Sequence, residues 1–146
     1  MTLIKCFSCG AETEDVNGST HKYLLSTPGC WARYNEVLAR EYSDYSYMQV
    51  HNLTVDAYSI QHSGLPNPQT INSANIHLSS LYAHFKQQVA ISELGKVKQK
   101  LAQFKNEFIW LEPPVDLGYL TINDVWVAEN SVEHCDYVKK WARGGF

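Results

Sequence analysis

Long apolar runs are missing from this sequence. No apolar run of signal-peptide length follows the N-terminus, and nowhere do about 18 apolar residues follow one another, as a membrane-spanning helix requires. We therefore expect a soluble, cytoplasmic protein with no membrane segment. A glycine-rich phosphate loop, a Walker sequence and the nucleophile elbow of serine hydrolases are missing too. Nucleotide hydrolysis and serine-hydrolase chemistry are therefore not leading hypotheses.

An excess of charge is also absent. The formal net charge is -3, so no overall field draws the protein onto nucleic acid or an anionic membrane. Five lysines do cluster in the second half of the chain, at Lys86, Lys96, Lys98, Lys100 and Lys105. A basic patch on one helix is one interpretation, but a solvated helix surface is the more common meaning of such a cluster. Nucleic-acid binding is therefore one hypothesis, and the net charge argues against it.

Length and composition indicate a single globular domain. The chain has 146 residues, of which 45% are apolar and 18% charged, and it shows no internal repeat or low-complexity tract. We predict one domain over residues 1–146 that is mainly α, a bundle of about five helices. Residues 1–31, which contain three of the four cysteines, would form a small zinc-knuckle-like loop leading into the first helix, and residues 32–146 the helical core.

Capping residues and prolines mark the expected helices. Thr27 and Pro28 predict the start of one, and Asn67 and Pro68 the start of the longest one. The apolar stripe of the first helix is predicted at Trp31, Tyr34, Leu38 and Tyr42. We predict helices over residues 28–42, 54–62, 68–89, 97–111 (ending before Pro113) and from 130 onward. A loop is expected over 43–48, a polar loop over 10–20, and either a strand or a helical turn after 117.

A cysteine-rich stretch near the N-terminus carries the clearest chemical signal. Its spacing is C-x2-C-x11-H-x8-C, and a Cys-x-x-Cys pair in a glycine-containing turn directs two thiolates at one ion. We predict a structural Zn2+ site of the Cys3His type, with the ligands Cys6, Cys9, His21 and Cys30. His21 is the nearest histidine in sequence, but His62 or His134 could supply the fourth ligand from a helix end. Ordinary buried thiols and a redox dithiol remain as alternatives.

Three further histidines are expected near the inner faces of separate helices. If His62, His77 and His134 converged, they could hold a second metal with one position left for water, and Asp56 could act as base or orient a ligand. No short motif such as HExxH joins these histidines, so hydrogen-bonded core histidines are the simpler interpretation. Trp31 and four tyrosines, Tyr42, Tyr45, Tyr47 and Tyr58, could also line an apolar pocket for a small planar ligand. Core residues with their hydroxyls at the rim are the more common meaning of such tyrosines.

Several longer motifs resemble those of one family. They are CxxCG from Cys6, Thr20-His21-x-Tyr23, Pro28-Gly29-Cys30-Trp31, the run from Leu53 to His62 (LTVDAYxxQH), and His134 followed by Trp141-Ala142. Together they resemble an uncharacterised bacterial family of small cytoplasmic proteins, a domain of unknown function. The resemblance implies no activity, substrate or cofactor.

Three functions are consistent with these patterns. The first is a zinc-stabilised cytoplasmic protein with a binding or regulatory role toward a small-molecule or protein ligand. The second is a metal-dependent hydrolase or lyase that uses a second, histidine-ligated metal. The third is a nucleic-acid-binding zinc module. The sequence leaves open whether the chain is an enzyme and which catalytic residues it would use.

Overall fold

A computed structural model describes residues 2–112 and 118–144 of the chain. Mainly helical structure is confirmed: these residues form seven α-helices and one two-stranded sheet. The elements are β1 (Leu3–Lys5), β2 (Glu12–Glu14), α1 (Pro28–Ser43), α2 (Tyr45–Met48), α3 (His51–Gln61), α4 (Pro68–Gln87), α5 (Leu94–Leu101), α6 (Ile122–Trp126) and α7 (Ser131–Gly144), with 3-10 helices η1 (Ile91–Glu93) and η2 (Ala102–Glu107). None of the described helices is both long and apolar enough to cross a membrane.

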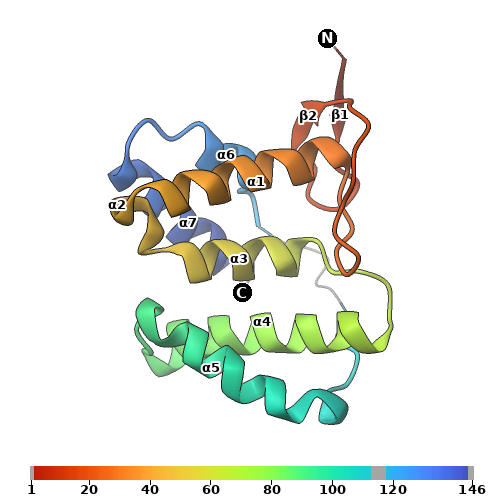
Figure 1. Cartoon of the computed structure of the whole chain (residues 1–146), viewed down its shortest axis with the longest axis vertical. Helices are drawn as coiled ribbons and strands as arrows, with labels where there is room; N and C mark the ends of the chain where they lie inside the picture. Colours follow the sequence, from red (N-terminus) through yellow and green to blue (C-terminus); the bar gives the residue numbers. More distant parts are fainter. Residues whose placement is uncertain (1, 113–117, 145–146) are drawn as a thin grey trace.

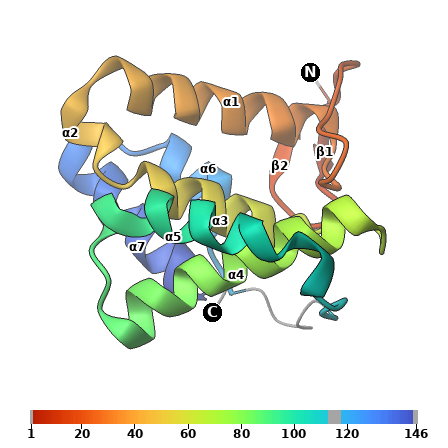
Figure 2. The same cartoon turned by 60° about the horizontal axis from the view of Figure 1, so that its bottom comes forward.

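Helix α3 lies at the centre of the helical body. It contacts α1 on one side, α4 on another and α7 behind, as Figures 1 and 2 show from two directions. Eight of its eleven residues are buried, among them Leu53, Tyr58 and the charged Asp56. A helix buried on nearly every side must satisfy its polar groups internally. The residues around the buried polar groups of α3 are therefore where a functional site is to be sought.

The predicted helix starts at two prolines are confirmed. Thr27 caps α1, with its hydroxyl accepting from the Cys30 N–H at 3.4 Å, and Pro28 is the first helical residue. Asn67 caps α4 in the same way, accepting from the Thr70 N–H at 2.9 Å. Both signals are local, because proline fixes its own φ and a cap bonds within its own turn.

Several other predicted helix boundaries differ from those of the structure. The helix expected from residue 54 begins at His51, and residues 45–48 of the expected loop form the short helix α2. The helix expected over 97–111 begins at Leu94 and gives way after Leu101 to η2, where Phe104 leaves helical geometry; Pro113 lies outside the described residues. After 117 the helical alternative holds, because Thr121 and Asp124 form a capping box at the start of α6.

The N-terminal segment is a hairpin packed against one end of α1. Strands β1 and β2 pair antiparallel, with Ile4 opposite Thr13, so part of the expected polar loop is a strand. Figure 1 shows this hairpin beside the first turn of α1 and on the same side of the molecule as the C-terminal end of α3. Three segments distant in sequence thus meet at one corner.

Candidate metal centre

Two cysteines lie in the turn that joins β1 to β2. Cys6 follows β1, and its N–H donates to the Ala11 carbonyl at 2.9 Å, while the Gly10 N–H donates back to the Cys6 carbonyl at 2.8 Å. Gly10 has φ +83°, a left-handed conformation that glycine adopts without strain. The turn is therefore closed by its own backbone, and it holds the Cys6 and Cys9 side chains on one side.

The third cysteine belongs to the first turn of α1. Cys30 has no solvent exposure, and its N–H bond to the Thr27 cap fixes its backbone. Its sulfur lies at the positive end of the helix dipole, which favours a thiolate there. The cap that starts the helix therefore also positions a metal-ligating atom.

The fourth group is His62, which immediately follows α3. Its Nδ1–H donates to the Tyr58 carbonyl at 2.8 Å, so the lone pair of the neutral ring is on Nε2. Nε2 lies 3.5 Å from the Cys30 sulfur. A backbone bond from the Leu25 N–H to the His62 carbonyl, at 2.8 Å, ties this end of α3 to the segment before α1. The orientation is the one that a metal-ligating histidine requires.

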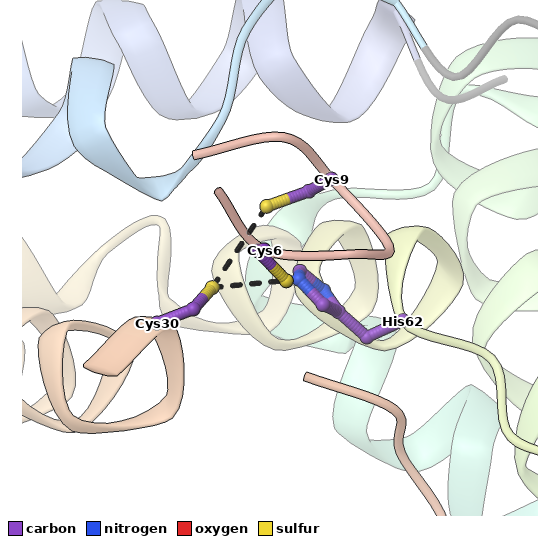
Figure 3. Close-up of side chains that lie close together, drawn as sticks. All are labelled: Cys6, Cys9, Cys30 and His62. Atoms are coloured by element: carbon purple, nitrogen blue, oxygen red, sulfur yellow. Dashed lines mark hydrogen bonds between the residues drawn. The ribbon is translucent and has the colours of Figure 1, made fainter. Parts of the chain in front are cut away.

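Together these side chains form one compact Cys3His group, drawn in Figure 3. The ligand atoms of Cys6, Cys9, Cys30 and His62 all lie within 4.8 Å of one another. Zinc bonds of about 2.3 Å to sulfur and about 2.0 Å to nitrogen place tetrahedral ligands about 3.8 Å (S–S) and about 3.5 Å (S–N) apart. The Cys9 and Cys30 sulfurs are 3.8 Å apart, and the Cys30–His62 distance is the 3.5 Å given above. The residues present thus fit a tetrahedral ion.

Neighbouring groups support the sulfur atoms. The Tyr58 hydroxyl lies 3.3 Å from the Cys30 sulfur, where it can donate to a thiolate, and the Ala11 N–H donates to the Cys9 sulfur at 3.4 Å. The Tyr58 ring also stacks on the His62 ring, with centroids 3.8 Å apart. Such surrounding bonds orient ligands and stabilise negative charge on sulfur.

Protons are shared unequally among the three thiols. Hydrogen bonds from Cys30 and Cys9 lower the pKa of Cys6 far below its usual value. Cys30 shows the opposite effect: its hydrogen bonds with Cys6 and Cys9, together with burial, raise the pKa of its thiol. The hydrogen bond with Cys30 lowers the pKa of Cys9, but the bond with Cys6 and burial outweigh it and raise that pKa to about 12. A divalent ion would replace the shared protons, so its binding should release protons.

His21, the first choice for the fourth ligand, is not part of this group. Its Nδ1 accepts from the Tyr23 N–H at 3.0 Å, and its ring packs against Trp31 with centroids 5.6 Å apart. The physical reason is that Cys30 faces the end of α3, whereas residue 21 lies in the segment that precedes α1. Of the two alternatives considered for this ligand, the structure places His62 in the group.

The three histidines considered for a second metal do not converge. His62 belongs to the Cys3His group, and the His77 Nδ1 donates to buried Asp56 at 2.6 Å. His134 donates from Nε2 to Glu41 at 2.8 Å. Each is thus a hydrogen-bonded histidine in its own setting. Within residues 2–112 and 118–144 the one group of at least three such ligands is the Cys3His cluster.

Sequence reasoning missed Glu41, which is fully buried and accepts bonds from His134 and His51, both at 2.8 Å. The inner stripe of α1 runs through Tyr34, Val37 and Glu41, one position away from the predicted one, and Tyr42 is 67% exposed. The sequence did offer one signal for a buried carboxylate: Glu41 lies seven residues after Tyr34, which places both on the same helix face.

The four tyrosines considered for an apolar pocket do not line one together. Tyr42 and Tyr45 are largely exposed, and Tyr58 is buried beside the Cys3His group. A cavity of about 420 Å³ does exist beside Trp31, but Tyr34 is the tyrosine of α1 that lines it. Helices α3 and α4, the segment before α1 and Lys105 of η2 contribute the rest of its lining.

Comparison with known proteins identifies a family. The model of a family of unknown function (DUF5946) matches residues 4–144, and the chain belongs to this family. Searches of the curated proteins and of the solved structures found no match. The resemblance noted in the sequence is confirmed at the level of the family. Because the family has no known function, the role of the site rests on its own chemistry.

Proposed function

We propose that this member of a family of unknown function is a zinc-stabilised binding protein, in which Cys6, Cys9, Cys30 and His62 hold one structural Zn2+. The proposal rests on the Cys9–Cys30 S–S distance and the Cys30–His62 S–N distance, which agree with those of a zinc tetrahedron. A thiolate-rich set of four protein ligands suits zinc and leaves no position open for water. The ion would therefore have a structural role.

The positions of the ligands indicate what the ion would stabilise. Two come from the β1–β2 turn, one from the start of α1 and one from the end of α3. Zn2+ would join the hairpin and two helices at the corner where they meet. Loss of the ion would free the hairpin and leave buried thiols and an imidazole unpaired.

The binding role rests on the cavity next to this corner. Its wall includes Trp31 and Tyr34 of α1, and Tyr34 stacks on Tyr58, which contacts the Cys30 sulfur. Cavities of a few hundred Å³ with aromatic walls and a few polar groups are typical of small-molecule sites. Zinc would hold the aromatic wall of the cavity in place.

Metal content per chain tests the proposal. Protein purified without a histidine tag should contain one zinc per chain. Cys9→Ser should lose it and melt roughly 10 °C lower, since the bound ion stabilises only the folded state. Plasma mass spectrometry and a thermal melt measure the two effects.

The fourth cysteine provides a matched control. Cys135 is buried in α7, and its sulfur donates to the Ser46 carbonyl at 3.4 Å, away from the cluster. Cys135→Ser should therefore keep the zinc. Wild-type protein without metal, or an equal loss in both variants, would contradict the assignment.

A further inference from the structure

The cavity of about 420 Å³ has two chemically different sides. One side is aromatic and apolar, and includes Trp31, Tyr34 and Val55. The other is a face of α4, whose residues 69, 72, 73, 76 and 77 recur at helical spacing and are Gln69, Asn72, Ser73, Ile76 and His77. A ligand in this cavity would have a planar apolar part against the first side and polar atoms toward the second.

His77 is held in one orientation by groups behind it. Its Nδ1–H donates at 2.6 Å to Asp56, a carboxylate with no solvent exposure. Asp56 also accepts from the Ser80 hydroxyl at 2.6 Å and from the Lys98 ammonium at 2.9 Å. The lone pair of neutral His77 is therefore on Nε2. Among the described residues Nε2 has no hydrogen-bond partner, which leaves it available to a ligand.

The charges around His77 favour an anion. Asp56 is already balanced by Lys98, so a proton on His77 would add an uncompensated positive charge. Lys105 of η2 lines the same cavity, and its described lining contains no Asp or Glu. The other titratable groups that line it are His21 and Tyr23 from the segment before α1 and Tyr34 from α1. A ligand with one negative charge would balance protonated His77.

We infer that this cavity binds a small planar organic acid, an aromatic monocarboxylate in chemical class, with its ring against Trp31 and Tyr34 and its carboxylate at His77. This inference rests on the proposed role as a binding protein and names the ligand class. His77 takes one proton from solvent onto Nε2 as the carboxylate binds, and no covalent bond changes. Asp56 is a positioning residue, which stabilises the imidazolium through Nδ1.

Calorimetric titration of the zinc-loaded protein with 1-naphthoate tests the inference, with uncharged 1-naphthamide as the matched probe. Naphthoate should bind at least roughly tenfold more tightly than naphthamide. At pH 7.5 in HEPES and in Tris, the dependence of the heat on buffer should give uptake of up to about one proton per ligand. The affinity for naphthoate should fall as pH rises, because its binding takes up a proton.

Two histidine variants on α4 separate the site from the scaffold. His77→Gln should weaken naphthoate roughly tenfold and abolish the proton uptake, while leaving the weak binding of naphthamide unchanged. His84→Gln is the control, because His84 bonds to the Val89 carbonyl at 2.8 Å and does not line the cavity. It should bind naphthoate as the wild type does.

Zinc content measured on the same samples distinguishes two failures. If the protein holds zinc but binds naphthoate no better than naphthamide, or if His77→Gln binds naphthoate normally, the inferred ligand class is wrong and the zinc assignment stands. If the wild-type protein holds no zinc, the proposed function fails, whatever the titration shows. Stronger binding of naphthoate with proton uptake through His77 would establish the inference.

Discussion

At the scale of single residues, Glu41 shows how the core holds a charge. Its carboxylate has no solvent exposure and accepts hydrogen bonds from His134, His51 and Thr54. Burial raises the pKa of Glu41, but these three bonds outweigh burial and hold the pKa below its usual value. Because the bonds come from α3 and α7, the charge joins three helices.

Glu41→Gln should destabilise the protein in a pH-dependent way. At pH 7 the loss should be roughly 3 kcal/mol, because buried donors lose an ionised partner. The folded pKa lies below the unfolded one, so the ionised carboxylate stabilises the fold above the unfolded pKa. That contribution is lost as pH falls through the folded pKa, below the usual value of 4.5. Urea unfolding at several pH values should show the difference between wild type and variant shrinking on the acid side; a constant difference would contradict this account.

At the scale of elements, the contact between the hairpin and α1 depends on a missing side chain. Strand β2 packs so closely on the first turn of α1 that a Cβ at Gly29 would overlap the Glu14 carbonyl oxygen and the Thr13 hydroxyl. The obstacle is partly backbone, which cannot rotate away. Close packing at Gly29 therefore positions the turn that carries Cys6 and Cys9 relative to Cys30.

Gly29→Ala should displace the hairpin and weaken the metal site. We expect destabilisation of roughly 1–3 kcal/mol from overpacking, together with weaker zinc binding in competition with a chelator. Gly95→Ala is the matched control: Gly95 lies in α5 with open space around it, and alanine favours a helix there. Equal zinc affinity in both variants would show that the packing at Gly29 does not position the ligands.

At the scale of the whole molecule, what could be predicted from the sequence depended on how far apart the interacting residues lie along the chain. The starts of α1 and α4 were predictable, because Thr27-Pro28 and Asn67-Pro68 act within one turn. The three cysteines were recognisable as ligands because Cys6 and Cys9 form a Cys-x-x-Cys pair within one turn and Cys30 follows in the first turn of α1. The fourth ligand was not, since His62 reaches Cys30 only through the packing of α3 against α1 and the hairpin.

Buried charges were the other part that could not be predicted. The pairing of Asp56 with His77 and Lys98 joins three helices, and one sequence carries no record of such contacts. Lys98, expected on a solvated surface, is largely buried against that carboxylate. The alternative in which three histidines converge on a metal could not be decided from the sequence for the same reason, because helix faces fix neither the rotation nor the depth of a side chain.

X-ray absorption at the zinc edge tests the central claim most directly, because it measures the atoms bound to the ion. The account predicts three sulfurs at about 2.3 Å and one imidazole nitrogen at about 2.0 Å. His62→Ala should replace the imidazole signal with a water-like oxygen and keep the three sulfurs, whereas His21→Ala should leave the spectrum unchanged. A shell without sulfur, or one altered by His21→Ala and not by His62→Ala, would contradict the Cys6–Cys9–Cys30–His62 site.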